Sequence, residues 1–102
     1  MRRRRRRQGN RGRKPKAVFI GRQPQADVFT PQPSSGKPPI LIEPAELEAF
    51  RLVDMEGLSQ EEAGERMGVS RGTIWRLLQE ARRKTAQALT EGRRIQIPSE
   101  DT

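Results

Sequence analysis

Residues 71–79 combine arginine, threonine, tryptophan and glutamine side chains with one glycine in a short stretch. Their chemistry is multiple hydrogen bonding, because an arginine can bind guanine through two bonds and a glutamine can bind adenine in the same way. The candidate base-contacting residues are Arg71, Gly72, Thr73, Trp75, Arg76 and Gln79. Trp75 has two interpretations, since its ring suits contact with a sugar or a thymine methyl and equally suits covering the edge of a core.

Cationic side chains and helix starts around this stretch suit phosphate binding. Arg82, Arg83 and Lys84 follow it, and a run of arginines stands at the N-terminus. The free N–H groups at the start of a helix also bind phosphate oxygens. The candidate phosphate contacts are Ser59, Gln60, Ser70, Arg82, Arg83, Lys84, Arg2, Arg3, Arg4, Arg5, Arg6 and Arg7.

A long helix has to carry the base-contacting candidates. Ser70 is a typical helix cap and Gly92 a typical helix end, so the pattern predicts a helix over residues 71–90. Apolar and small residues recur at helical spacing and predict one buried stripe: Ile74, Leu77, Leu78, Ala81, Thr85, Ala88 and Leu89. The opposite side of this helix carries Gly72, Arg76, Gln79 and Arg83.

A short helix precedes the long one. Ser59 and Glu62 have the spacing of a capping box, and Gly68 suits a left-handed residue after the last turn. Ala63 and Gly64 are small enough to let two helices cross closely. Two capped helices joined by a tight glycine-containing turn are typical of a helix-turn-helix.

A further helix is expected before this pair, over residues 44–56, because Pro44 suits a first helical position and Gly57 suits a helix end. Short strands at 40–42 and 95–97 would form a pair. The predicted fold class is all-α: a compact helix-turn-helix domain of three helices with a long last helix, a disordered basic N-terminal arm, and a possible short strand pair at the domain edges.

Charge and composition divide the chain of 102 residues into four parts. Residues 1–16 are predicted to be a disordered arginine-rich arm, 17–39 an extended proline-rich linker, 40–97 the helix-turn-helix domain, and 98–102 a disordered tail. Residues 1–42 hold twelve Lys and Arg against one Asp, whereas 43–69 hold two against eight acidic residues. Residues 70–94 hold seven against two, which gives one end of the domain a positive face.

Several classes of protein are excluded by what the chain lacks. With no Cys and no His, thiol chemistry, His-based catalysis and Cys/His zinc sites are impossible, so we expect no enzyme, no catalytic residue, no metal ligand and no cofactor. No apolar run approaches the roughly 20 residues needed to span a bilayer, so no membrane partner is expected. A cytoplasmic, nucleoid-associated location is expected.

Four runs of the sequence resemble a family of small, uncharacterised prokaryotic proteins: residues 46–52, 56–63, 67–73 and 81–84. The resemblance covers residues 40–97, and loosely the region of Phe19 and Phe29. Members of this family are expected to bind DNA through a helix-turn-helix similar to region four of sigma factors. The resemblance implies a winged-helix-sized all-α domain and a role in transcription.

The resulting hypothesis is a sequence-specific DNA-binding transcriptional regulator, with a helix-turn-helix in the major groove and a basic arm on phosphates. Double-stranded DNA is the expected partner, with RNA polymerase and a second copy of the chain as further candidates. One alternative is an RNA-binding protein whose arginine arm binds the RNA. Another is an accessory protein that touches DNA only together with RNA polymerase.

Overall fold

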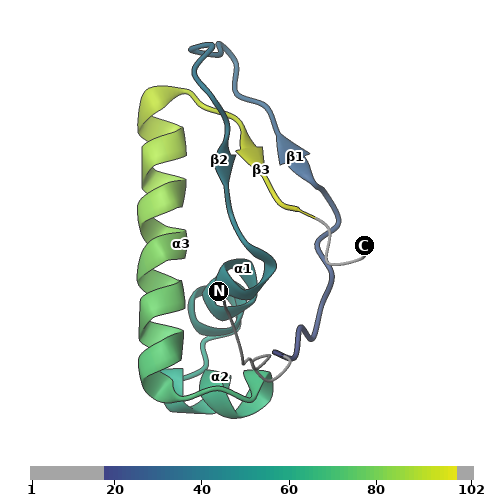
Figure 1. Cartoon of the computed structure of the whole chain (residues 1–102), viewed down its shortest axis with the longest axis vertical. Coiled ribbons are helices and arrows are strands. Elements are labelled where there is room, and N and C mark those ends of the chain that lie inside the picture. The colour runs from purple at the N-terminus through teal and green to yellow at the C-terminus, as the bar shows by residue number, and fades with distance from the viewer. Residues whose placement is uncertain (1–17, 99–102) are drawn as a thin grey trace, which may run out of the picture.

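The computed structural model describes residues 18–98 (Figure 1). In chain order the elements are β1 (Val28–Phe29), β2 (Ile40–Leu41), α1 (Pro44–Phe50), the π-helix η1 (Arg51–Met55), α2 (Gln60–Met67), α3 (Arg71–Glu91) and β3 (Ile95–Gln96). The predicted disordered arm, residues 99–102 of the predicted tail, and the candidates Arg2 to Arg7 lie outside the described residues. The expectation of a mostly helical chain is confirmed.

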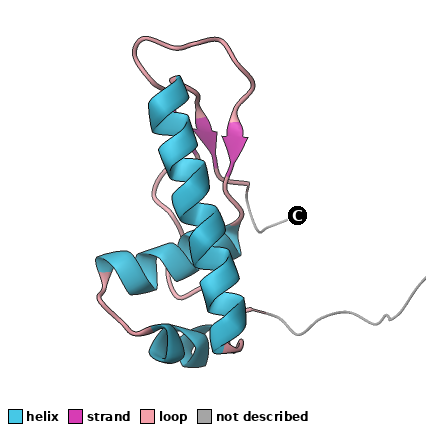
Figure 2. Ribbon diagram, turned by 90° about the vertical axis from the view of Figure 1, so that its left-hand side faces the viewer, coloured by secondary structure: helices cyan, strands magenta, loops and turns pink. Residues whose placement is uncertain are grey.

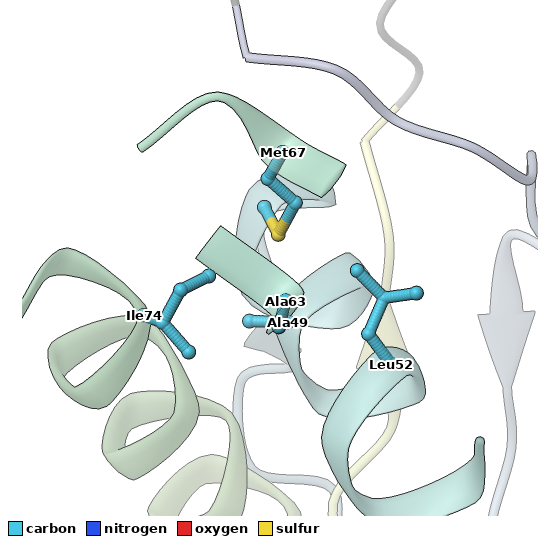
Figure 3. Close-up of a cluster of buried hydrophobic side chains, with 5 residues drawn as sticks. All are labelled: Ala49, Leu52, Ala63, Met67 and Ile74. Carbon is cyan, nitrogen blue, oxygen red and sulfur yellow. The ribbon is translucent and has the colours of Figure 1, made fainter. Parts of the chain in front are cut away.

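The core lies where α1, η1, α2 and α3 meet. Five fully buried side chains form its main cluster: Ala49, Leu52, Ala63, Met67 and Ile74 (Figure 3). They come from all four helical segments, so the cluster fixes the position of α2 and α3 relative to α1. Along α3, Leu78, Ala81 and Ala88 extend the buried stripe. Leu89 was predicted in this stripe, and that prediction is wrong, because its side chain is 77% exposed on the flank of α3.

The expected first helix is present over its predicted length, but its second half is π-helical. Its N-terminus has a capping box that was not predicted from the sequence, in which Glu46 Oε1 accepts the N–H of Glu43 at 2.9 Å. From Arg51 onward, the backbone hydrogen bonds span five residues instead of four, as in the bond of 2.9 Å from Glu56 N to Arg51 O. Gly57 then ends the segment at φ +80°.

The strands form a three-stranded sheet in the order β1-β3-β2. The expected pairing of 40–42 with 95–97 is confirmed and is parallel, with Ile40 opposite Ile95. β1 adds an antiparallel strand that was not predicted, with Phe29 opposite Ile95, and it comes from the segment expected to be a linker. Figure 1 shows the sheet beside the C-terminal part of α3.

α2 and the loop between β1 and β2 lie at opposite ends of α3 (Figures 1 and 2). α2 directly precedes α3 and packs at its N-terminus. The loop is held at the other end by a hydrogen bond of 2.9 Å from Ser35 N to Gly92 O. Because α3 has 21 residues, these two ends are separated by about 30 Å.

Candidate functional site

The connection between α2 and α3 is closed by local hydrogen bonds. Ser59 and Glu62 form the predicted capping box, with bonds of 3.0 and 2.9 Å between side chain and backbone in each direction. α2 ends at Gly68, whose φ of +74° is in the left-handed region that favours glycine. These observations confirm the predicted start and end of α2.

Gly64 lies where α2 meets the start of α3. A Cβ atom placed on Gly64 would stand 2.7 Å from the backbone oxygen of Val69, a distance that real Cβ atoms essentially never show. The backbone of the connection also approaches α2 directly, since Val69 N donates to Gly64 O at 2.9 Å. The absent side chain therefore permits this close approach.

The first turn of α3 carries a chain of polar contacts. Ser70 caps the helix by accepting the N–H of Thr73 at 3.1 Å, and the two hydroxyl groups lie 3.0 Å apart. Arg76 Nη2 donates to Thr73 Oγ1 at 3.3 Å, which orients the guanidinium group along the helix surface. Thr73 is thus half-buried and engaged by two neighbours, whereas Arg76 extends toward solvent.

Most of the candidate base-contacting residues share the outer side of α3. Arg71, Gly72, Trp75 and Arg76 are exposed, and Thr73 and Gln79 are half-buried. Trp75 is 53% exposed, so its ring is not part of the buried core. Within residues 18–98, Arg71 and Arg76 form no ion pair, which leaves their charges available to an external anion.

The three cations further along α3 are each paired with a carboxylate. Arg82 binds Asp54, Arg83 binds Glu80, and Lys84 binds Glu46, each at 2.8 Å. Their hydrogen bonds to Asp54 and Glu80 raise the pKa of Arg82 and Arg83, respectively. Any phosphate at these positions has to compete with an internal carboxylate.

Lys84 is the least accessible of the three cations. Its Nζ donates to Glu46 Oε1, the atom that also caps α1, and only 18% of the Lys84 side chain is exposed. Arg82 and Arg83 stay more open, at 44% and 59%. Of the three predicted phosphate contacts, Lys84 is therefore the least available to a phosphate, because its ion pair with Glu46 joins α3 to α1.

The candidate phosphate contacts at the two helix starts are also engaged by groups within the protein. The Ser59 hydroxyl is used by the capping box of α2, and Ser70 is used by the cap of α3. Both remain at exposed helix starts, and Gln60 is half-buried. Only the backbone N–H groups of these turns, and not the capping oxygens, suit phosphate binding.

The contact between the N-terminal segment and the α2–α3 connection was not predicted from the sequence. Phe19 N donates to Met67 O at 3.1 Å, and Val18 packs against the main core cluster. The apolar run at 18–20 was the only signal, and it does not reveal the partner. Asp54 was missed too, because nothing local distinguishes it from a solvated acid.

The helices of the described segment include none long and apolar enough to cross a membrane.

A protein-family model described as "Protein of unknown function DUF134" matches residues 1–101. The UPF0251 protein PF0620 of Pyrococcus furiosus is 58% identical over 90 residues, which are 85% of this chain and 83% of that protein. The UPF0251 protein of Archaeoglobus fulgidus is 47% identical, over 85% of this chain and 83% of its own length. UPF0251 protein Teth39_0655 of Thermoanaerobacter pseudethanolicus is 41% identical, with 83% and 74% covered. No solved structure shows significant similarity.

The chain therefore belongs to the DUF134, or UPF0251, family, which confirms the resemblance to an uncharacterised prokaryotic family.

Proposed function

We propose that this chain is a sequence-specific DNA-binding protein that regulates transcription, with α2 and α3 acting as a helix-turn-helix. The observation that carries the proposal is the outer surface at the start of α3. There, Arg71 and Arg76 are exposed and form no ion pair within the described residues. Gly72, which is also exposed, has no side chain to obstruct close approach of DNA.

The arrangement of α2 and α3 suits this role. In a helix-turn-helix, the first residues of the second helix reach the base edges while the preceding helix crosses the DNA backbone. α2 packs against the start of α3 at Gly64, and both helices expose capped N-termini. The net charge of these segments also favours binding to DNA, because residues 70–94 carry a net positive charge and the arm carries a larger one.

The residues divide into two roles in this proposal. Base edges are read by Arg71, Arg76 and Gln79, with Trp75 available for contact with a sugar or thymine methyl. Phosphates are bound by the helix starts, by Arg82 and Arg83 after their internal partners release them, and by the arm of Arg2 to Arg7. This function would place the protein in the cytoplasm on the nucleoid.

Selection of duplexes from a random library at a fixed salt concentration tests the proposal. We expect enrichment of one short motif, and a palindromic motif would in addition indicate a dimer. A library that shows no enrichment after repeated rounds contradicts the proposal. Structured RNA added as competitor distinguishes the alternative: RNA that removes the enriched duplex at equal concentration favours an RNA-binding protein.

A further inference from the structure

We propose that a cleft between residues 20–25 and the helical segments α1 and η1 binds a small organic anion with an apolar body and one carboxylate. The cleft has a volume of about 530 Å³, which lies within the usual range for small-molecule sites, about 300–1,000 Å³. All of its lining residues belong to the described part of the chain. The site is separate from the outer surface of α3, so it does not depend on the proposed function.

The cleft lies between two walls that hydrogen bonds hold in place (Figure 1). Gly21 N donates to Glu48 Oε2 at 2.8 Å, which ties the start of segment 20–25 to α1. Just beyond the other end of this segment, Asp27 O accepts the N–H of Ile97 at 2.9 Å, directly after β3. Between these two bonds the segment runs apart from α1 and η1, and the cleft occupies the space between them. The fold therefore fixes both walls of the site.

The surface of the cleft is mostly apolar. Both walls contribute apolar side chains: Ile20, Pro24, Pro44, Leu47, Phe50 and Met55. Met55 is 65% exposed, so a ligand with an apolar body would remove its side chain from water, which is favourable. The second wall includes the π-helix η1, and single π-helical turns are frequent at functional sites. The shape and surface of the cleft thus suit an apolar ligand body.

The charged side chains around the cleft leave one cation for the ligand. Glu48 and Arg51 bind each other at 2.7 Å. Asp54 is bound by Arg82 of α3 at 2.8 Å. Arg22 also lines the cleft, is exposed, and forms no ion pair within residues 18–98. A guanidinium group binds a carboxylate through two parallel hydrogen bonds, so the lining favours an anionic ligand over a cationic one.

Methionine methyl signals allow a direct test, because Met55 lines the cleft whereas Met67 is fully buried in the core. The full chain, labelled with ¹³C at its methionine methyl groups, is titrated with 2-naphthoate, and Met55→Leu assigns the signal. We expect a saturable shift of the Met55 signal and an unaltered Met67 signal. No shift of Met55 at millimolar 2-naphthoate, or equal shifts of both signals, would overturn the inference. A Met55 signal that moves on dilution of the free protein would also overturn it, since a second copy of the chain would then occupy the cleft.

An uncharged analogue of the probe tests the class of ligand. 2-Naphthamide has the same rings as 2-naphthoate without the charge. It should bind about two- to fivefold more weakly, as expected for the loss of one exposed ion pair. Equal or tighter binding of the amide would contradict a site for anions.

Arg22→Gln tests the residue assigned to the carboxylate. It should weaken binding of 2-naphthoate about two- to fivefold and leave binding of 2-naphthamide unaltered. Arg94→Gln is the matched control, because Arg94 is exposed, forms no ion pair within the described residues and does not line the cleft. Equal effects of the two variants would contradict the role of Arg22. None of these measurements involves DNA, so their failure and the failure of the proposed function are distinguishable.

Discussion

Arg82 and Asp54, 28 residues apart in the sequence, form a two-point ion pair between the middle of α3 and the end of η1. Arg82 Nε lies 3.0 Å from Asp54 Oδ2, and Arg82 Nη2 lies 2.8 Å from Asp54 Oδ1. The two N–H groups of Arg82 that would otherwise bind a phosphate together are thus both engaged by the Asp54 carboxylate. This contact links the helix proposed to bind DNA to the segment that precedes α2.

Replacing Asp54 should strengthen DNA binding. Asp54→Asn removes the carboxylate that competes with phosphate for Arg82, so the salt dependence should steepen by about 0.9 in the slope of log K against log salt. Binding titrations at several salt concentrations measure this change. Asp27→Asn is the control for net charge, since Asp27 forms no ion pair within residues 18–98. Equal effects of the two variants would show that only the total charge matters.

The same pair predicts an acid dependence of stability. Hydrogen bonds from Arg82 lower the pKa of the Asp54 carboxyl from its ordinary value of 3.8. A lowered pKa in the folded state means that the pair stabilises the fold above pH 3.8 and loses this effect as the pH falls through the folded-state pKa. Urea unfolding between about pH 5 and pH 2 should show a decline of the unfolding free energy that is smaller in Asp54→Asn. Identical declines would contradict the role of the pair.

Gly64→Ala should destabilise the fold, because the new Cβ would stand 2.7 Å from the backbone oxygen of Val69. Backbone cannot move aside as a flexible side chain does, so a loss of about 1–3 kcal/mol in the free energy of unfolding is expected. Thermal and urea unfolding measure the loss. Unaltered stability would mean that α2 and α3 do not need this close approach.

Gly72→Ala should separate folding from function. A Cβ atom at this position meets only Ser70 Oγ, at 3.9 Å, so the fold tolerates it and gains up to about 1 kcal/mol of helix propensity. Binding to the selected duplex should nevertheless weaken, because the added methyl group stands on the surface proposed to approach the bases. Equal or tighter binding would remove Gly72 from the proposed contact surface.

The arm should account for much of the salt dependence. Changing Arg2 to Arg7 into glutamine removes six charges and should reduce the slope of log K against log salt by up to about five. Affinity should fall on all duplexes alike, because phosphate contacts carry no base information. An unaltered slope would contradict binding of the arm to DNA.

Local signals explain what could be predicted from the sequence. The caps at Ser59 and Ser70 and the helix-ending Gly68 act within a few residues, so the bounds of α2 and α3 follow from short patterns. β1 escaped prediction because two residues are too few for a period to appear. The partners of Arg82 and Phe19 lie 28 and 48 residues away, and no local pattern specifies contacts at that distance.

Leu89 was predicted to be buried, but its side chain is exposed. Its spacing places it close to the buried stripe of α3, but the spacing cannot reveal that the neighbouring elements leave this flank uncovered. The π-helical turn at 51–55 was also unpredicted, because a segment of five residues is too short for the apolar pattern of a π-helix to be distinguished from that of an α-helix.

Equilibrium binding of Arg76→Ala and Gln79→Ala to the enriched duplex tests the central claim most directly. Gln87→Ala is the matched control, because Gln87 is half-buried like Gln79 but lies further along α3, away from the proposed contact surface. Each good base contact that is lost should weaken specific binding by about 1–3 kcal/mol, roughly a 5- to 150-fold rise in Kd, while binding to unrelated duplex changes little. The control should bind like the original chain. Full affinity and unaltered selectivity in both variants would show that the outer surface of α3 does not read DNA.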